Sequence, residues 1–239
     1  MESTELIPKY YKIQELLLGK IRTGEWKVGD EIPSEQDLCS TYNVSRGTLR
    51  RAIDALVRQG LLTRIQGKST FVAKPKIPIF SNGFRADIRS SGQFANSRIL
   101  YYDKRPCPDD ITALLSLDNA PMIYELSRVI EAEHEPIILE HVYIPDNYGE
   151  KLTVDDLIQT SLLDLIPQAC GILLKKAIES YEPTLLTQEE AHRLNAKAGQ
   201  VAILDQAITF DINNIPVFLS KALIRGDRAR VATEITFTI

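Results

Sequence analysis

The segment 33–72 constrains the fold of this chain most, because it marks the ends of two short helices. Ser34, followed three residues later by Asp37, matches a Ser-x-x-acid capping box, in which the serine oxygen accepts a backbone N–H of the first turn. Ser45 begins a second helical pattern, and Gly60 follows its end, where a left-handed residue is usual. The spacing predicts two capped helices joined by a short turn.

The second helix has an apolar face and a basic face. The apolar residues that recur with the helical period are Leu49, Ala52, Ile53, Leu56 and Val57. Arg46 and Arg50 lie on the opposite face, with Arg51 to one side. A recognition helix enters the major groove of DNA with such a basic N-terminal end. The pair is therefore predicted to be a DNA-binding helix-turn-helix.

A β-hairpin is predicted over residues 61–73, directly after the second helix. Two β-rich runs flank the turn Gln66-Gly67-Lys68-Ser69, and a short turn that contains glycine is a hairpin signal. Arg64 and Lys68 place positive charge at or near the tip, and a narrow basic tip suits the sugar-phosphate backbone or the minor groove. The whole segment then forms a winged helix-turn-helix.

The excess positive charge of the chain is concentrated in the segment that contains the second helix and the hairpin. Residues 43–76 carry a net charge of +7, whereas residues 1–42 carry −3 and residues 77–239 carry −8. A solvated helix face is the alternative interpretation of the arginines. An acidic protein with one basic segment is more typical of a domain with a polyanion-binding face.

Several motifs in this stretch resemble a known family. They are P-S-E-x-x-L from Pro33, V-S-R-x-T-L-R from Val44 and G-K-x-T-F-V from Gly67. They resemble the N-terminal domain of the GntR family of bacterial transcription regulators, which usually has glycine where this chain has Ser69. The resemblance implies that the DNA-binding residues are Ser34, Gln36, Ser45, Arg46, Thr48, Arg50, Gln66, Gly67 and Lys68.

The chemistry of these residues agrees with those roles. Arg46 and Arg50 are each suited to a bidentate pair with guanine, which is worth about 1–3 kcal/mol of discrimination. Ser45 and Thr48, at the helix N-terminus, suit phosphate contacts.

Composition excludes other classes of protein. No apolar run reaches the roughly 18 residues of a membrane span, and the N-terminus has no signal-peptide core. The cysteines, Cys39, Cys107 and Cys170, are odd in number and far apart, so neither a disulfide framework nor a zinc site is expected. We expect a cytoplasmic protein without a metal or cofactor.

The rest of the chain is predicted to be a second, α+β domain. We place the first domain at residues 1–74, a proline-stiffened linker at 75–80 and the second domain at 81–239. Strand-like runs lie near 97–102, 122–130, 137–144, 172–181, 201–211, 217–224 and 231–238. Helical patterns lie at 109–115, 161–169 and 187–195. Short turns between runs favour antiparallel hairpins.

This second part resembles the UTRA domain, the effector-binding module of the HutC subfamily. The matching segments are Gly83-Phe84, Arg128-Val129, E-P-I-x-L-E from Glu135, Y-I-P from Tyr143, Ser161-Leu162 and R-G-D-R from Arg225. The resemblance implies a chorismate-lyase-like antiparallel sheet with helices. It also implies that the residues around a small-molecule effector are Phe84, Arg128, Glu140 and Ser161.

Each of these four residues has a structural alternative. Arg128 is suited to an anion of the effector, yet it could pair internally with Glu140. Ser161 could cap a helix, and Phe84 could belong to the core. Sugar-phosphate-sensing members often have an arginine, an acidic residue and a tyrosine where this chain has Ile130, Phe218 and Leu163. These departures favour a less charged or more apolar metabolite, or a smaller anion.

The sequence thus predicts a metabolite-responsive transcription factor that acts as a repressor. It is predicted to bind a pseudo-palindromic operator as a homodimer. The alternatives are a lyase-like enzyme that carries a DNA-binding domain and an architectural DNA-binding protein without a ligand. Neither is favoured, because no catalytic motif stands out and the second domain is twice as long as the first.

Overall fold

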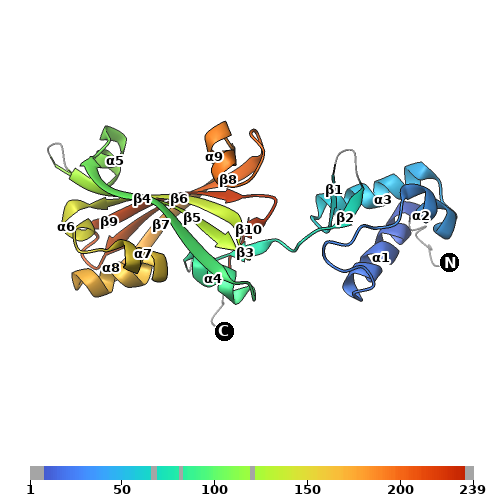
Figure 1. Cartoon of the computed structure of the whole chain (residues 1–239), viewed down its shortest axis with the longest axis horizontal. Coiled ribbons are helices and arrows are strands. Elements are labelled where there is room, and N and C mark those ends of the chain that lie inside the picture. Colours follow the sequence, from blue (N-terminus) through green and yellow to red (C-terminus); the bar gives the residue numbers. More distant parts are fainter. Residues whose placement is uncertain (1–7, 66–68, 81–82, 119–121, 235–239) are drawn as a thin grey trace, which may run out of the picture. The chain divides into compact units, whose positions relative to one another are not determined.

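The computed structural model describes residues 8–65, 69–80, 83–118 and 122–234 (Figure 1). The chain divides into two compact units, Met1–Lys76 and Ile77–Ile239.

The first unit is a winged helix-turn-helix. Its elements are α1 (Lys9–Arg22), α2 (Glu35–Tyr42), α3 (Arg46–Arg58), β1 (Leu62–Arg64) and β2 (Thr70–Val72). The strands pair antiparallel as the wing, with Leu62 opposite Val72. Apolar residues from all three helices and both strands form one core, which contains Leu17, Leu38, Leu49, Ile53, Leu56, Leu62 and Val72. The predicted helix pair and hairpin are confirmed.

Local capping explains where the two helices of the pair begin and end. Ser34 and Ser45 each accept a hydrogen bond at 3.2 Å from the backbone N–H three residues later. Asn43 ends α2 in the left-handed conformation, and Gly60, just after the end of α3, also has a positive φ. The turn between the helices is therefore specified by residues within it.

The second unit is built on a six-stranded antiparallel sheet with the strand order β4-β5-β6-β9-β8-β7. Its strands are β4 (Ala95–Pro106), β5 (Met122–Ala132), β6 (Glu135–Pro145), β7 (Leu174–Leu185), β8 (Val201–Asp211) and β9 (Pro216–Arg225). Its helices are α4 (Phe84–Ser90), α5 (Asp109–Leu114), α6 (Asp146–Gly149), α7 (Val154–Gln159), α8 (Leu162–Cys170) and α9 (Gln188–Arg193). Helices α4, α7 and α8 cover one face of the sheet, and α5 and α9 lie on the other (Figure 1).

The segment expected as a linker contains a strand instead. Ile77–Ile79 forms β3, which pairs parallel with β10 (Ala229–Val231). The prolines of this segment do not keep it out of a sheet. Pro78 has no N–H to give, but the ladder uses the N–H of Ile77 and the carbonyl of Ile79 on either side of it. Burial of both isoleucines holds the strand against the second core.

Other differences concern the ends of elements. The strand expected over 231–238 is not found in the described part of that range, because β10 ends at Val231 and residues 232–234 are irregular. Residues 235–238 lie outside the described part of the chain. Helices α4, α6 and α7 were not predicted; the last begins at Thr153, which accepts a hydrogen bond from the Asp156 N–H in a capping pattern that the sequence does contain.

Candidate nucleic-acid interface and sheet cavity

The N-terminal end of α3 presents four of the predicted DNA-binding residues, Ser45, Arg46, Thr48 and Arg50. Arg46 and Arg50 are exposed, and so is Gln36 on the preceding helix. Ser45 Oγ lies 2.9 Å from Thr48 Oγ1, which places both hydroxyls at the first turn of α3. Ser34 caps α2, and Gln66, Gly67 and Lys68 lie outside the described residues. The structure thus places the described members of the predicted set around one helix pair.

Carboxylates beside this surface pair with some of its arginines. Glu35 Oε2 accepts from Arg50 Nε at 2.7 Å, and its other oxygen lies 3.4 Å from Arg64. Arg64 also pairs with Asp54 at 2.6 Å. The hydrogen bond and charge of Glu35 raise the pKa of Arg50, which keeps it a cation. Arg46 has no such partner within the described residues, so no carboxylate there holds its guanidinium group.

The sheet of the second unit aligns charged residues in one cross-strand row. Arg128 on β5 lies opposite Glu140 on β6, which lies opposite Ala222 on β9. Ala222 in turn lies opposite Asp205 on β8, and Asp205 lies opposite Tyr181 on β7. Residues directly opposite each other in an antiparallel sheet point to the same face. The row therefore brings two carboxylates to one face, with a small alanine between them.

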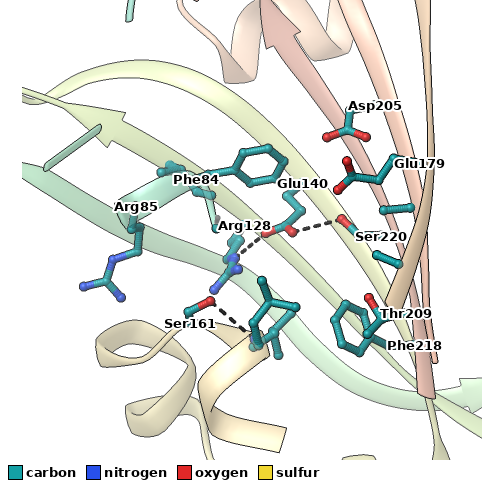
Figure 2. Close-up of a pocket in the computed structure, with 16 residues that line it drawn as sticks. Phe84, Arg85, Arg128, Glu140, Ser161, Glu179, Asp205, Thr209, Phe218 and Ser220 are labelled. Atoms are coloured by element: carbon teal, nitrogen blue, oxygen red, sulfur yellow. Dashed lines mark hydrogen bonds and ion pairs between the residues drawn. The ribbon is translucent and has the colours of Figure 1, made fainter. Parts of the chain in front are cut away.

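That face holds a cavity of about 90 Å³ beneath α4 and α8. All four residues predicted to surround an effector line it, namely Phe84, Arg128, Glu140 and Ser161. The three positions that depart from sugar-phosphate-sensing members, Ile130, Leu163 and Phe218, line it as well. Residues that the sequence did not single out complete the lining, and they include Arg85, Ala177, Glu179, Asp205, Ala207, Thr209 and Ser220 (Figure 2).

Arg128 and Glu140 form a buried ion pair. Arg128 Nε lies 2.6 Å from Glu140 Oε2, and both side chains are almost fully buried. Arg128 Nη1 donates to the carbonyl of Leu157 in α7 at 3.2 Å, and Glu140 Oε1 accepts from Ser220 Oγ at 3.0 Å. The internal pairing that the sequence left open is thus present, at the wall of the cavity.

Ser161 and Gly83 meet where two segments approach closely. Ser161 caps α8, accepting from the Leu163 N–H at 3.3 Å. Gly83, directly before α4, has a φ of 95°, and a Cβ there would lie 3.0 Å from Ser161 Oγ. Only glycine suits such a backbone at that distance. This requirement explains why glycine is the residue directly before α4, where the chain turns to place Phe84 against the cavity.

Two ionisable groups at the cavity have shifted pKa values. Burial, followed by the charges of Glu179 and Glu140, raises the pKa of Asp205 to about 7. Burial, followed by the nearby guanidinium groups of Arg89 and Arg128, lowers the pKa of Arg85. Both shifts reflect charges that the protein holds away from water without full compensation.

The sequence contained a pattern that could have identified Asp205 as a site residue, but none that could have identified Glu179. Asp205 interrupts the apolar run Val201-Ala202-Ile203-Leu204 of β8, and a charge inside a buried strand indicates a site. Glu179 lies in the polar strand β7, where a carboxylate is unremarkable.

Metal and membrane sites are not found where the structure can be described. No group of His, Cys, Asp or Glu in those residues could hold a metal ion. None of the helices drawn in colour in Figure 1 is both long and apolar enough to cross a bilayer.

A winged helix-turn-helix with an exposed basic recognition helix, followed in the same chain by a sheet domain with a lined cavity, defines a class of DNA-binding regulators. Residues 9–72 match the family "Bacterial regulatory proteins, gntR family", and residues 90–230 match the UTRA domain. The chain belongs to the GntR family, with the architecture of the HutC subfamily.

Named relatives share both domains. The chain is 32% identical over 225 residues to the HTH-type transcriptional repressor NagR of Bacillus subtilis, covering 93% of this chain and 92% of that one. It is 29% identical over 228 residues to a probable fructoselysine utilization operon transcriptional repressor of Escherichia coli, covering 94% and 93%. The chain is therefore a transcription regulator and not an enzyme.

A solved structure has the same fold. The crystal structure of PhnF from Mycobacterium smegmatis aligns with a TM-score of 0.67 at 23% identity, covering 97% of this chain and all of that one. The predicted α+β class, with its winged helix-turn-helix and sheet domain, is confirmed.

Proposed function

We propose that this protein is a repressor that binds a pseudo-palindromic operator as a homodimer and is released by a small molecule bound in the sheet cavity. One observation carries the proposal. The four residues that the resemblance assigns to an effector converge on a single cavity, in a chain whose other unit presents a basic recognition helix. The relatives named as repressors support the direction of control. Such a regulator acts in the cytoplasm, where bacterial DNA lies.

A homodimer is proposed because one winged helix contacts too few base pairs for a specific operator. The strand β7 supports this proposal, since it is an outer strand of the six-stranded sheet. Exposed sheet edges readily pair with another chain. Leu173, Ile178 and Leu185, beside or within this strand, are 66%, 57% and 62% exposed. We assign the contact with a second copy to this edge, and sedimentation of full-length protein tests it.

The proposed switch is a shift in population between two arrangements of the paired DNA-binding units. A bound effector favours the arrangement whose spacing does not match two half-sites. Operator affinity that stays unchanged when a metabolite is bound would contradict this mechanism.

The apolar residues of the cavity support the proposed character of the effector. Ile130, Leu163 and Phe218 occupy positions that are often polar in sugar-phosphate sensors, and all three line the cavity. We therefore propose a less charged metabolite, or one whose anionic group is small.

The DNA interface is tested with three alanine variants. An operator is first selected from random duplexes with the wild-type protein. Arg46→Ala and Arg50→Ala should each weaken binding by about 1–3 kcal/mol, because each removes a bidentate contact with a base. Arg58→Ala, at the far end of α3, is the matched control and should have a small effect on specific binding. Equal losses of affinity in all three variants would indicate that the interface binds DNA only through its overall positive charge.

A further inference from the structure

Asp205 is a buried polar residue of the cavity. Its residue is only 4% exposed, and its Oδ1 has no hydrogen-bond partner among the described residues. A buried carboxylate without a partner is strongly unfavourable, and proteins keep such groups chiefly where something else completes them. Asp205 lines the cavity, so a bound molecule can reach it.

Further carboxylates surround this position. Glu179 lies two residues before Tyr181, the residue directly opposite Asp205 on β7. Such diagonal neighbours are roughly 7–8 Å apart, within reach of long side chains. Glu179 accepts from the Tyr181 hydroxyl at 2.8 Å and is also part of the lining. Glu140, one strand beyond Ala222, adds a third carboxylate, and burial together with Glu179 and Glu140 raises the pKa of Asp205.

The cations of the cavity do not neutralise Asp205. Arg128 is held by Glu140 and by the carbonyl of Leu157. Arg85 comes from α4 and donates to the carbonyl of Ile158. Figure 2 shows Arg85 on the side of the cavity away from Asp205 and Glu179. The cavity therefore has a basic side and an acidic side, and the acidic side lacks a counterion among the described residues.

We propose that the effector carries a cationic nitrogen, an amine in its ammonium form, which binds to Asp205 with Glu179 beside it. This inference rests on the proposed function, because it assigns a chemical class to the ligand of the same cavity. An ammonium group has three donors and no acceptor, which complements a place that offers carboxylate oxygens. Charge-assisted hydrogen bonds of this kind are stronger than those between neutral groups.

Two other occupants are distinguishable from an amine. A hydroxyl group could donate to Asp205, but it carries no charge and would leave the carboxylates uncompensated. A metal ion needs several ligands in a suitable geometry, and the described residues contain no such group. The charged group of an organic cation would neutralise the carboxylates. Its carbon atoms would pack against the apolar walls at Phe84, Leu163 and Phe218.

The test uses pairs of compounds that differ only by an amino or a hydroxyl group. Suitable pairs are alanine and lactate, serine and glycerate, ethanolamine and ethylene glycol, and glucosamine and glucose. Their dissociation constants with the full chain are obtained from thermal shifts, since a ligand of the native state raises the melting temperature. For the pairs that fit, the amine should bind roughly 10- to 100-fold more tightly than its hydroxyl counterpart.

Three variants locate the preference. Asp205→Asn should abolish the difference in affinity between each amine and its hydroxyl counterpart. Glu179→Gln should reduce that difference. Glu179 is an exposed residue of an outer strand, so its variant remains informative if Asp205→Asn folds poorly. Glu182→Gln removes the same charge from the same strand at a position that does not line the cavity, and it should keep the difference.

The outcomes separate this inference from the proposed function. Equal binding of amines and hydroxyl counterparts, or an amine preference that survives in Asp205→Asn, would overturn the inference. If hydroxyl compounds bind as tightly as their amine counterparts and release operator DNA, the sensor function stands while the amine is excluded. If amines bind with the expected preference but operator affinity never changes, the site stands and the switch fails. Absence of any amine preference overturns the inference whether or not other compounds bind.

Discussion

Each unit of this protein contains an arginine–glutamate pair of similar length, in opposite surroundings. In the DNA-binding unit, Arg50 lies 2.7 Å from Glu35, and the two side chains are 63% and 30% exposed. In the sheet unit, Arg128 lies 2.6 Å from Glu140, and the exposed fractions are 6% and 5%. The two pairs have the same chemistry and nearly the same length. They differ in how much water surrounds them.

That difference decides what each pair can do. Water screens the exposed pair, so Arg50 can leave Glu35 for another partner at little cost. The buried pair has lost its hydration, and either partner left alone would be a buried charge without compensation. Arg128 and Glu140 therefore shape the cavity wall permanently, whereas Arg50 remains available for exchange.

The largest effect is expected from breaking the buried pair. Glu140→Gln should destabilise the sheet unit by about 3–5 kcal/mol, because it leaves the Arg128 guanidinium buried without its counterion. Urea unfolding followed by circular dichroism measures the change. Trp26, the single tryptophan of the chain, packs in the core of the other unit, so its fluorescence transition should not move.

A double replacement sharpens this result. Arg128→Met combined with Glu140→Leu removes both charges together, and should cost much less than Glu140→Gln alone. A double variant as unstable as the single one would show that packing, and not the uncompensated charge, dominates this site.

An intermediate effect is expected at Asp205, a buried carboxylate that lacks the partner that Glu140 has. The folded pKa is about 7 and the ordinary value is 3.8. Between these values the unfolded chain has released its proton while the folded chain retains it, so stability falls as pH rises to about 7. Asp205→Asn should therefore raise the melting temperature most near pH 8, and the gain should shrink toward about pH 5.

The groups that surround Asp205 define the controls for this measurement. Glu179 and Glu140 are the carboxylates that act on it, and Arg128 is engaged by Glu140. Glu179→Gln should give a smaller gain with the same direction of pH dependence, because it removes one repulsive charge. A gain in Asp205→Asn that is constant from about pH 5 to pH 8 would show that Asp205 does not titrate in this range.

The smallest effect on stability is expected from breaking the exposed pair. Glu35→Gln should change the free energy of unfolding of the DNA-binding unit by less than about 1 kcal/mol, measured by Trp26 fluorescence. Affinity for DNA of any sequence should rise modestly, because Arg50 and Arg64 lose a competing carboxylate. Glu15→Gln, an exposed position on α1, is the matched control. Lower affinity in Glu35→Gln would mean that Glu35 holds Arg50 in position for DNA.

The DNA-binding unit was largely predictable because its signals are local. Ser34 and Ser45 cap helices through the third residue after each, and Asn43 and Gly60 end them, so a short window contains cause and result. The sheet unit was predictable strand by strand, since the apolar runs mark β5, β6, β8 and β9. Its order was not, because β6 pairs with β9 across some eighty positions, as the Ser220–Glu140 hydrogen bond illustrates.

The sequence by itself determined the helix pair, its basic face and the class of protein. It also named four residues that line the cavity, although only through resemblance to a family. Tertiary structure decided which of two equivalent ion pairs loses its water and where Asp205 lies. The burial of the ion pair and the position of Asp205 depend on which strands are neighbours and which helices cover them. Burial turns a common ion pair or a single carboxylate into a strong electrostatic constraint.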